Sequence, residues 1–319
     1  MILKKNINNK NMNRTGWLVN DCLTCIPGTQ TFWHNLLNWF PELIDKTNGY
    51  TDYSILAECI ELQLSSTKPD YIIRNGSYFR RIHTNIKTIS LIQDIIINND
   101  MQKDVIHTST IVVFNTNYVY QKYKHLIKDE SSYRIFPLGV DFDFFHPILQ
   151  RHPDVLPNSI LFIGSSSYNP KGFDIMLHIM HTMEHRNFCL IMKDSYSIHD
   201  LPESLRHRVR IFNRVNQEAV RLIINSCSIG VCTSREETQH LSGIECGACN
   251  IPMIGREVGF YYDCKDSTEW GLIATDDTYV EKIDYMMTHL NEFRPREYLI
   301  NKYSTEHCKM NWIQLIKSL

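Results

Sequence analysis

Residues 229–254 read IGVCTSREETQHLSGIECGACNIPMI and combine three features of an α/β protein. The apolar strand Ile229–Cys232 runs out into a polar loop that contains Glu237, and the segment after the loop has helical apolar spacing and carries Glu245. Open α/β sheets bind ligands at the carboxyl ends of their strands. Two carboxylates at this edge, one on the loop and one on the helix, are therefore placed to hold two parts of an elongated polar ligand.

The same stretch resembles the donor-site signature of the retaining glycosyltransferases of family 4, which have the GT-B fold. In that signature a Glu-x7-Glu pair precedes a small-residue helix and an Ala-Cys-Gly-Thr-Pro-Val-Val run, and residues 248–254 (ACNIPMI) stand in the same register. The resemblance implies two Rossmann-like α/β domains that face a cleft. It also implies transfer of a sugar, with retention of configuration, from a nucleotide-diphosphate-sugar donor to a glycan, lipid or other hydroxyl acceptor. It is specific over residues 134–275 and only topological over residues 1–133.

Composition narrows the functional classes. The net charge of -2 over 319 residues gives no support for bulk nucleic-acid binding. The apolar runs are far too short to span a bilayer, although peripheral contact with a membrane is compatible with the sequence. The ten cysteines follow no regular framework, which indicates reduced thiols and a cytoplasmic protein. Two Cys-x-x-Cys pairs, Cys22/Cys25 and Cys246/Cys249, lie too far apart in sequence to favour a four-cysteine zinc site.

Short apolar strands alternate with helical stretches, which predicts parallel sheets covered by helices. The predicted organisation is a disordered tail (1–14), an acceptor-side Rossmann-like domain (15–140), a linker (141–158) and a donor-binding domain (159–303). A helix over residues 304–319 returns to the first domain in the resembled fold. Predicted strands cover residues 16–20, 71–74, 88–92, 110–114, 159–163, 187–191, 209–212, 229–232, 252–254 and 271–274. Predicted helices cover residues 30–40, after a loop at Pro27-Gly28-Thr29, and 117–123, 172–184, 216–225 and 241–249.

Residues 164–172 (GSSSYNPKG) follow a strand and open a helix, where free backbone amides and Lys171 form an anion site suited to a diphosphate. Relatives carry an arginine where Ser165 stands. The cation missing at that position would have to come from Arg235 or Arg214.

The resemblance assigns roles to residues of this chain. Glu237 and Lys171 are the predicted catalytic residues: Glu237 faces the sugar hydroxyls and Lys171 neutralises the diphosphate, while Glu245 faces the ribose hydroxyls. The loop at residues 238–242 offers backbone amides, with Thr238 and His240 replacing the usual glycines. The predicted donor-binding set is Gly28, Gly164, Ser165, Lys171, Ser234, Glu237, Thr238, Gln239, His240, Leu241 and Glu245.

Trp33 and Asp94 are the candidates for acceptor binding. GT-B enzymes generally need no metal in the active site, so neither a metal nor another cofactor is expected. His178, His181 and His185 share one side of a predicted helix, for which a solvated polar face is favoured over a metal site.

Three other functions remain open at this point. A GT-B protein could bind sugar nucleotides without turning them over, which the arginine missing at Ser165 favours. A glycosyltransferase of the same fold could act on modified nucleic-acid bases, which the near-neutral charge disfavours. A nucleotide or sugar-phosphate hydrolase would need an activated water, for which the motifs offer no residue.

Overall fold

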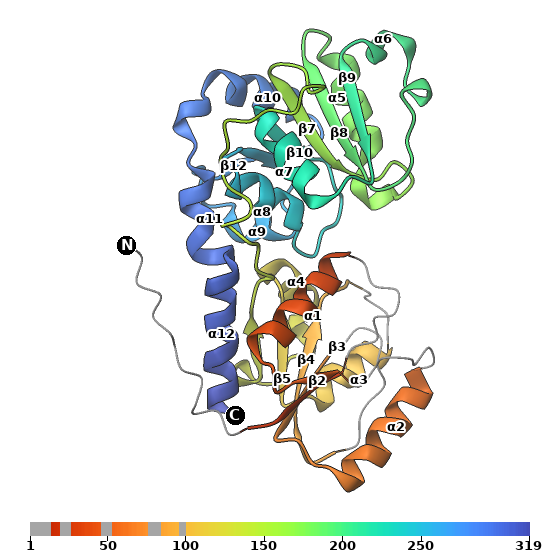
Figure 1. Ribbon diagram of the computed structural model, residues 1–319, viewed down its shortest axis with the longest axis vertical. Coiled ribbons are helices and arrows are strands. Elements are labelled where there is room, and N and C mark those ends of the chain that lie inside the picture. Colours follow the sequence, from red (N-terminus) through yellow and green to blue (C-terminus); the bar gives the residue numbers. More distant parts are fainter. Residues whose placement is uncertain (1–13, 20–26, 46–52, 76–83, 96–99) are drawn as a thin grey trace. The chain divides into compact units, whose positions relative to one another are not determined.

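The computed structural model describes residues 14–19, 27–45, 53–75, 84–95 and 100–319 (Figure 1). The chain divides into two compact units. The first unit consists of Met1–Asn115, Val119–Phe136 and Lys309–Leu319, and the second of Thr116–Tyr118 and Pro137–Cys308. Residues 1–13 of the predicted tail, and Cys22 and Cys25, lie outside the described residues.

The first unit is built on a six-stranded parallel sheet in the order β2-β1-β3-β4-β5-β6. Helices cover both faces of a parallel sheet, which is why β1 and β5 are apolar and buried along their whole length. The strands are β1 (Gly16–Val19), β2 (Ile44–Asp45), β3 (Tyr71–Asn75), β4 (Lys87–Ile92), β5 (Ile111–Phe114) and β6 (Tyr133–Ile135). The helices are α1 (Pro27–Trp39), α2 (Tyr53–Ser66), α3 (Asp100–Thr108) and α4 (Asn117–Tyr123).

The second unit is built on another six-stranded parallel sheet, in the order β12-β11-β10-β7-β8-β9. Counted along the chain this is the Rossmann order, and it reverses between β7 and β10. The strands are β7 (Ser159–Gly164), β8 (Asn187–Met192), β9 (Val209–Asn213), β10 (Ile229–Cys232), β11 (Met253–Gly255) and β12 (Gly271–Ile273). The helices are α5 (Phe173–Thr182), α6 (Glu203–Arg206), α7 (Gln217–Ser226), α8 (Leu241–Ala248), α9 (Phe260–Cys264), α10 (Tyr279–Thr288), α11 (Pro295–Tyr303) and α12 (Thr305–Ser318), which continues into the first unit.

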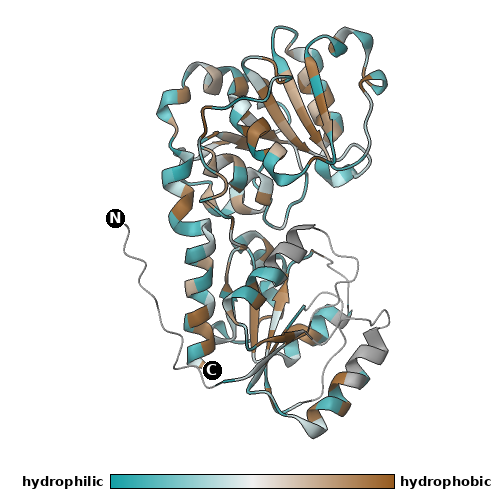
Figure 2. Ribbon diagram, viewed as in Figure 1, coloured by the Kyte–Doolittle hydropathy of each residue, from teal (hydrophilic) through white to brown (hydrophobic). Residues whose placement is uncertain are grey.

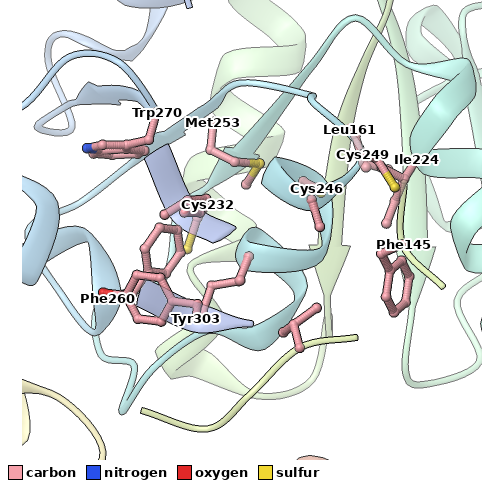
Figure 3. Close-up of a cluster of buried hydrophobic side chains, with 14 of the residues drawn as sticks. Phe145, Leu161, Ile224, Cys232, Cys246, Cys249, Met253, Phe260, Trp270 and Tyr303 are labelled. Atoms are coloured by element: carbon pink, nitrogen blue, oxygen red, sulfur yellow. The ribbon is translucent and has the colours of Figure 1, made fainter. Parts of the chain in front are cut away.

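Helix α8 is central to the second unit because its inward side enters one of the two main cores. Ile244, Cys246 and Ala248 are buried there with residues such as Phe260 and Trp270 (Figure 3). In Figure 2 the strands of this unit are largely hydrophobic and the loops around them hydrophilic. This packing fixes the axis of α8 and with it the side chains at its N-terminal end.

The predicted α/β class with two parallel sheets is confirmed. The segment 141–158, predicted as a linker, groups with the second unit, where Phe142 and Phe145 are buried. The guanidinium of Arg296 donates hydrogen bonds to the carbonyls of both phenylalanines, at 2.9 Å each. None of the helices in the described part of the chain has the length and apolar character needed to cross a bilayer.

The predicted strands agree with the structure within one residue over the described residues, and β10 and α4 have the predicted bounds. The predicted loop at Pro27-Gly28-Thr29 is wrong, because α1 begins at Pro27. Proline suits this position, since its fixed φ is helical and the first turn needs no N–H donor. Strands β2 and β6 and helices α2, α3, α6, α9, α10 and α11 were not predicted from the sequence.

Replacing Trp312 by alanine should destabilise the first unit. The indole is fully buried and meets Phe136 edge to face, with ring centroids 5.5 Å apart. Loss of such a side chain costs about 3–5 kcal/mol of unfolding free energy. Denaturant titration followed by far-ultraviolet circular dichroism measures the change. The control is Met310→Ala on the same helix, where the side chain is 41% exposed. Equal stability of the two variants would contradict the packing described for Trp312.

Candidate donor site

The candidate site lies in the second unit, at the carboxyl ends of β7 and β10, where the strand order reverses. Thr233 joins the loops after these strands: its hydroxyl donates hydrogen bonds to the carbonyls of Gly172 at 2.8 Å and Lys171 at 3.1 Å. Gly172 has φ of 62°, and a Cβ there would lie 2.1 Å from the Thr233 carbonyl oxygen. Only glycine permits this close approach. The two loops are therefore held against each other by contacts that depend on Thr233 and Gly172.

Lys171 and Glu237 form an ion pair across these loops. The Nζ of Lys171 lies 2.6 Å from Oε1 of Glu237, and the Ser234 hydroxyl donates to the same oxygen at 2.7 Å. Burial by itself would raise the pKa of Glu237, but the charges of His240 and Lys171 outweigh it and leave that pKa lowered. Burial would lower the pKa of Lys171, but the Glu237 carboxylate leaves it raised. Both side chains are therefore charged near neutral pH.

His240 begins α8 in a left-handed conformation, with φ of 67° and ψ of 69°. This conformation is uncommon for a residue other than glycine. Both ring nitrogens are hydrogen-bonded: Nδ1 to the Tyr261 hydroxyl at 2.8 Å and Nε2 to the Ser242 hydroxyl at 3.2 Å. A Cβ on Gly243 would lie 2.6 Å from Nδ1 and 2.5 Å from the Tyr261 oxygen, so the missing side chain makes room for this contact. The imidazole is thereby fixed beside Glu237.

Cys232, Glu237 and His240 are, among the described residues, a group of potential metal ligands whose donor atoms all lie within 4.8 Å of one another. Burial would lower the pKa of His240, but the Cys232 thiol and the Glu237 carboxylate leave it raised. Burial would raise the pKa of Cys232, but His240 leaves it lowered. The three side chains therefore interact electrostatically. By contrast His178, His181 and His185 are exposed, which confirms the predicted solvated face.

Glu245 lies in the middle of α8, half-buried, one helical turn beyond the loop that carries Glu237. Burial raises its pKa to about 7, against a smaller lowering by the charge of His240. A buried carboxylate is costly without a partner for its charge. Glu245 is therefore an acid whose charged form is disfavoured by its surroundings.

The loop after β7 already holds a carboxylate of the protein itself. Asp194 accepts hydrogen bonds from the backbone N–H groups of Ser166 and Ser167, at 2.9 Å each, and from the Ser165 hydroxyl at 2.9 Å. Burial would raise the pKa of Asp194, but these hydrogen bonds leave it strongly lowered. The sequence predicts that the backbone amides of this loop bind the anion of a ligand. In the structure the amides of Ser166 and Ser167 are instead bound by the carboxylate of Asp194. Gly164 sits at the base of this loop, where a Cβ would lie 2.5 Å from the Phe162 ring.

Neither arginine considered as a replacement for the one missing at Ser165 is placed like Lys171. Arg235 forms two hydrogen bonds with Asp174, at 2.8 and 2.5 Å, and another with the Asn169 carbonyl at 3.1 Å. Arg214 is exposed after β9, which is separated from β10 in the sheet by β7 and β8. Neither Arg235 nor Arg214 therefore joins Lys171 at the Glu237 carboxylate.

The loop between Glu237 and α8 is anchored from outside the motif. The side-chain amide of Gln239 accepts from the Leu138 N–H and donates to the Leu138 carbonyl, both at 2.8 Å. The Thr116 hydroxyl donates to the Thr238 carbonyl at 2.7 Å. Gln239 thus holds the loop with its side chain, and Leu241, partly buried, forms the first turn of α8.

The remaining predicted residues lie in the first unit. Gly28 is in the first turn of α1, and Trp33 is 2% exposed on the same helix. Asp94 follows β4, and its carbonyl accepts a hydrogen bond from the Tyr123 hydroxyl at 3.3 Å. Sequence reasoning missed Asp194, Tyr261 and Leu138. These residues lie 21 to 101 residues from their partners, so no local pattern marks them.

Two comparisons place the chain among known proteins. Residues 157–289 match the family model described as glycosyl transferases group 1. This range covers β7 to β12 and includes Lys171, Glu237 and Glu245. No curated protein matches the chain.

Solved structures extend the likeness to both units. Sucrose-phosphate synthase from Thermosynechococcus elongatus has a TM-score of 0.73 at 13% identity, covering 96% of this chain and 99% of that one. A glycosyltransferase from Rickettsia africae has a TM-score of 0.72 at 18% identity, covering 96% and 98%. Anabaena HepE in complex with UDP-glucose has a TM-score of 0.70 at 11% identity, covering 95% and 100%. These likenesses establish the fold, and the family model establishes the class of the second unit. The chain therefore has the GT-B fold, and its residues 157–289 are similar to the glycosyl transferases of group 1.

Proposed function

We propose that the chain moves a sugar from a nucleotide-diphosphate-sugar donor to a glycan, lipid or other hydroxyl acceptor, with retention at the anomeric carbon and without a metal ion. The observation that carries this proposal is the ion pair of Lys171 and Glu237, 2.6 Å apart at the point where the strand order reverses. The cation suits a diphosphate and the carboxylate suits sugar hydroxyls. The complex of HepE with UDP-glucose supports this class of donor.

Retention is explained by displacement on one face of the sugar. The bond from the anomeric carbon to the diphosphate oxygen breaks while the acceptor oxygen bonds to the same face, and the acceptor proton passes to the departing diphosphate. Lys171 then stabilises the charge that develops on the diphosphate. Glu237 orients both the lysine and the sugar hydroxyls, so that the protein contributes mainly position and charge.

Glu245 is proposed to accept hydrogen bonds from the ribose hydroxyls of the nucleotide. It lies on α8, whose first turn follows the loop that carries Glu237. The backbone amides at residues 238–242 are proposed to bind the sugar and the phosphates. In this proposal α8 binds the nucleoside of the donor, and the loop before α8 binds its sugar and phosphates.

Trp33 and Asp94 remain the proposed acceptor residues of the first unit. The burial of Trp33, at 2% exposure, favours a packing role for its ring. Asp94, which is half-buried, is the better candidate for a hydrogen bond with an acceptor hydroxyl.

A second candidate function is binding of a sugar nucleotide without turnover. One observation favours it: Asp194 accepts the hydrogen bonds of the amides of Ser166 and Ser167, and Ser165 supplies no cation. A donor would then depend on Lys171 for its diphosphate. Turnover, measured on the variants below, separates the two functions.

Replacing Glu237 by glutamine should lower kcat by roughly a hundredfold, because a neutral amide neither holds Lys171 nor accepts from the sugar as a carboxylate does. The assay follows release of nucleoside diphosphate from the donor in the presence of an acceptor panel. Glu236→Gln, a change of the exposed neighbouring residue, is the matched control and should retain turnover. Unaltered kcat in Glu237→Gln would remove Glu237 from the mechanism.

Replacing Glu245 by alanine should abolish a nucleotide-dependent increase in thermal stability. A ligand that binds only the folded protein at a hundred times its Kd contributes about 2.7 kcal/mol. A thermal-shift panel of nucleoside diphosphates and their sugar conjugates should therefore reveal one preferred base in the wild type. If the variant keeps the same selective shift, Glu245 does not contact the nucleoside.

Stability should depend on pH through Glu245. Its pKa is about 7 in the folded protein against an ordinary value of 4.5, so between these values the folded state binds more protons than the unfolded state. The contribution of Glu245 is therefore fully present below about pH 4.5 and is lost as the pH rises to about 7. Urea titrations at several pH values should show Glu245→Gln gaining stability over the wild type across this window. A constant difference would contradict the burial described for Glu245, and Glu236→Gln again serves as the control.

A further inference from the structure

The group formed by Cys232, Glu237 and His240 has the chemistry of a metal site. Cys232 is the last residue of β10, Glu237 lies in the following loop, and His240 begins α8. Their donor atoms lie within 4.8 Å of one another. A tetrahedral zinc ion, with bonds of about 2.0–2.3 Å, holds its ligand atoms roughly 3–4 Å apart. The three donor atoms therefore lie close to the separation that one zinc ion requires.

The types of ligand atom select the ion. A thiolate, an imidazole and a carboxylate together suit Zn²⁺ or Co²⁺, whereas Mg²⁺ and Ca²⁺ prefer oxygen alone. Three protein ligands leave a fourth position for water, as in zinc sites that are not closed.

The surroundings hold these ligands in place. The Tyr261 hydroxyl bonds to His240 Nδ1 at 2.8 Å, and the Ser234 hydroxyl bonds to Glu237 Oε1 at 2.7 Å. Such outer contacts fix the orientation of metal-binding side chains. Lys171 opposes a cation, because its Nζ lies 2.6 Å from Glu237 Oε1. An ion at this position must therefore compete with Lys171 for the Glu237 carboxylate.

We propose that Cys232, Glu237 and His240 bind a soft divalent cation such as Zn²⁺, and that the bound ion inhibits sugar transfer by withdrawing Glu237 from Lys171 and the donor. Binding displaces the thiol proton of Cys232 and the proton on the ligating nitrogen of His240 into solvent, and the sulfur, that nitrogen and a Glu237 oxygen then bond to the metal. The binding step stands independently of the reaction, whereas the inhibition rests on the proposed transferase function. The site is thus inhibitory and is not part of the transfer chemistry.

Cobalt binding tests the first half. The protein used carries Cys22→Ser and Cys25→Ser, which removes the first Cys-x-x-Cys pair of the sequence as another source of thiolate ligands. Addition of Co²⁺ should produce a thiolate charge-transfer band at one equivalent per chain. Cys232→Ser should abolish the band, while Cys246→Ser, a change at an equally buried thiol in the same core, should keep it (Figure 3).

Absence of the band, or its full retention in Cys232→Ser, overturns the site. The melting temperature of each variant without metal shows that it is folded. If Cys232→Ser does not fold, Glu237→Gln provides the second test, since loss of one ligand should weaken cobalt binding at least tenfold.

Zinc inhibition tests the second half. Donor turnover should fall as Zn²⁺ is added, and Cys232→Ser should need at least tenfold more Zn²⁺ for half-inhibition. Equal sensitivity of Cys232→Ser and the parent protein overturns the inhibitory role. A protein that binds Co²⁺ through Cys232 but turns over no donor would instead refute the transferase function and leave the metal site standing.

Discussion

The ion pair of Lys171 and Glu237 is the interaction on which the donor site depends. Each partner sits on a loop at the end of a different strand, so the pair exists only because β7 and β10 are neighbours in the sheet. Thr233 and Gly172 bring the two loops close enough for the pair to form. The Rossmann order of the second sheet thus has a chemical result: it places a cation and an anion together at one edge.

Glu237, one partner of this ion pair, also interacts with the buried imidazole of His240. Burial disfavours the charged form of an isolated carboxylate. The charges of His240 and Lys171 both stabilise the charged form of Glu237. To place its ring next to Glu237, His240 adopts a left-handed backbone conformation, which is unfavourable for a residue other than glycine. The hydroxyl of Tyr261 holds the ring in this position. The residues that replace the family's glycines therefore do more than narrow a loop, since one of them brings a buried imidazole to the carboxylate.

The elements of this chain differ in how far local sequence determines them. Strand β10 and helix α4 could be predicted to the residue, and for β10 the reason is that its apolar run ends at the polar residues Thr233 and Ser234. Helix α3 has only nine residues, mostly polar, and Val105 and Ile106 are buried by the tertiary fold. Its few apolar residues give little periodic signal.

The site divides in the same way. Glu237, Glu245 and Lys171 are found by motif and register, and the structure brings Lys171 to Glu237. The partners that hold the loops are distant in sequence: Leu138 is 101 residues from Gln239, and Asp194 is 28 residues from Ser166. These partners are determined by which loops the folded sheet brings together. A single sequence does not show which loops become neighbours.

The carboxylate of Asp194 has a consequence for how a donor meets the protein. The backbone N–H groups of the loop after β7 already donate hydrogen bonds to Asp194, so the loop is ordered before a phosphate binds. Donor binding therefore requires little loss of conformational entropy in this loop. A diphosphate then meets Lys171, whose charge is already paired with that of Glu237, and a loop that is bound to the carboxylate of Asp194. Attraction at long range is correspondingly weak, and donor affinity should vary little with ionic strength. Recognition in this chain is governed by short-range fit to hydroxyl groups more than by electrostatic capture of phosphate.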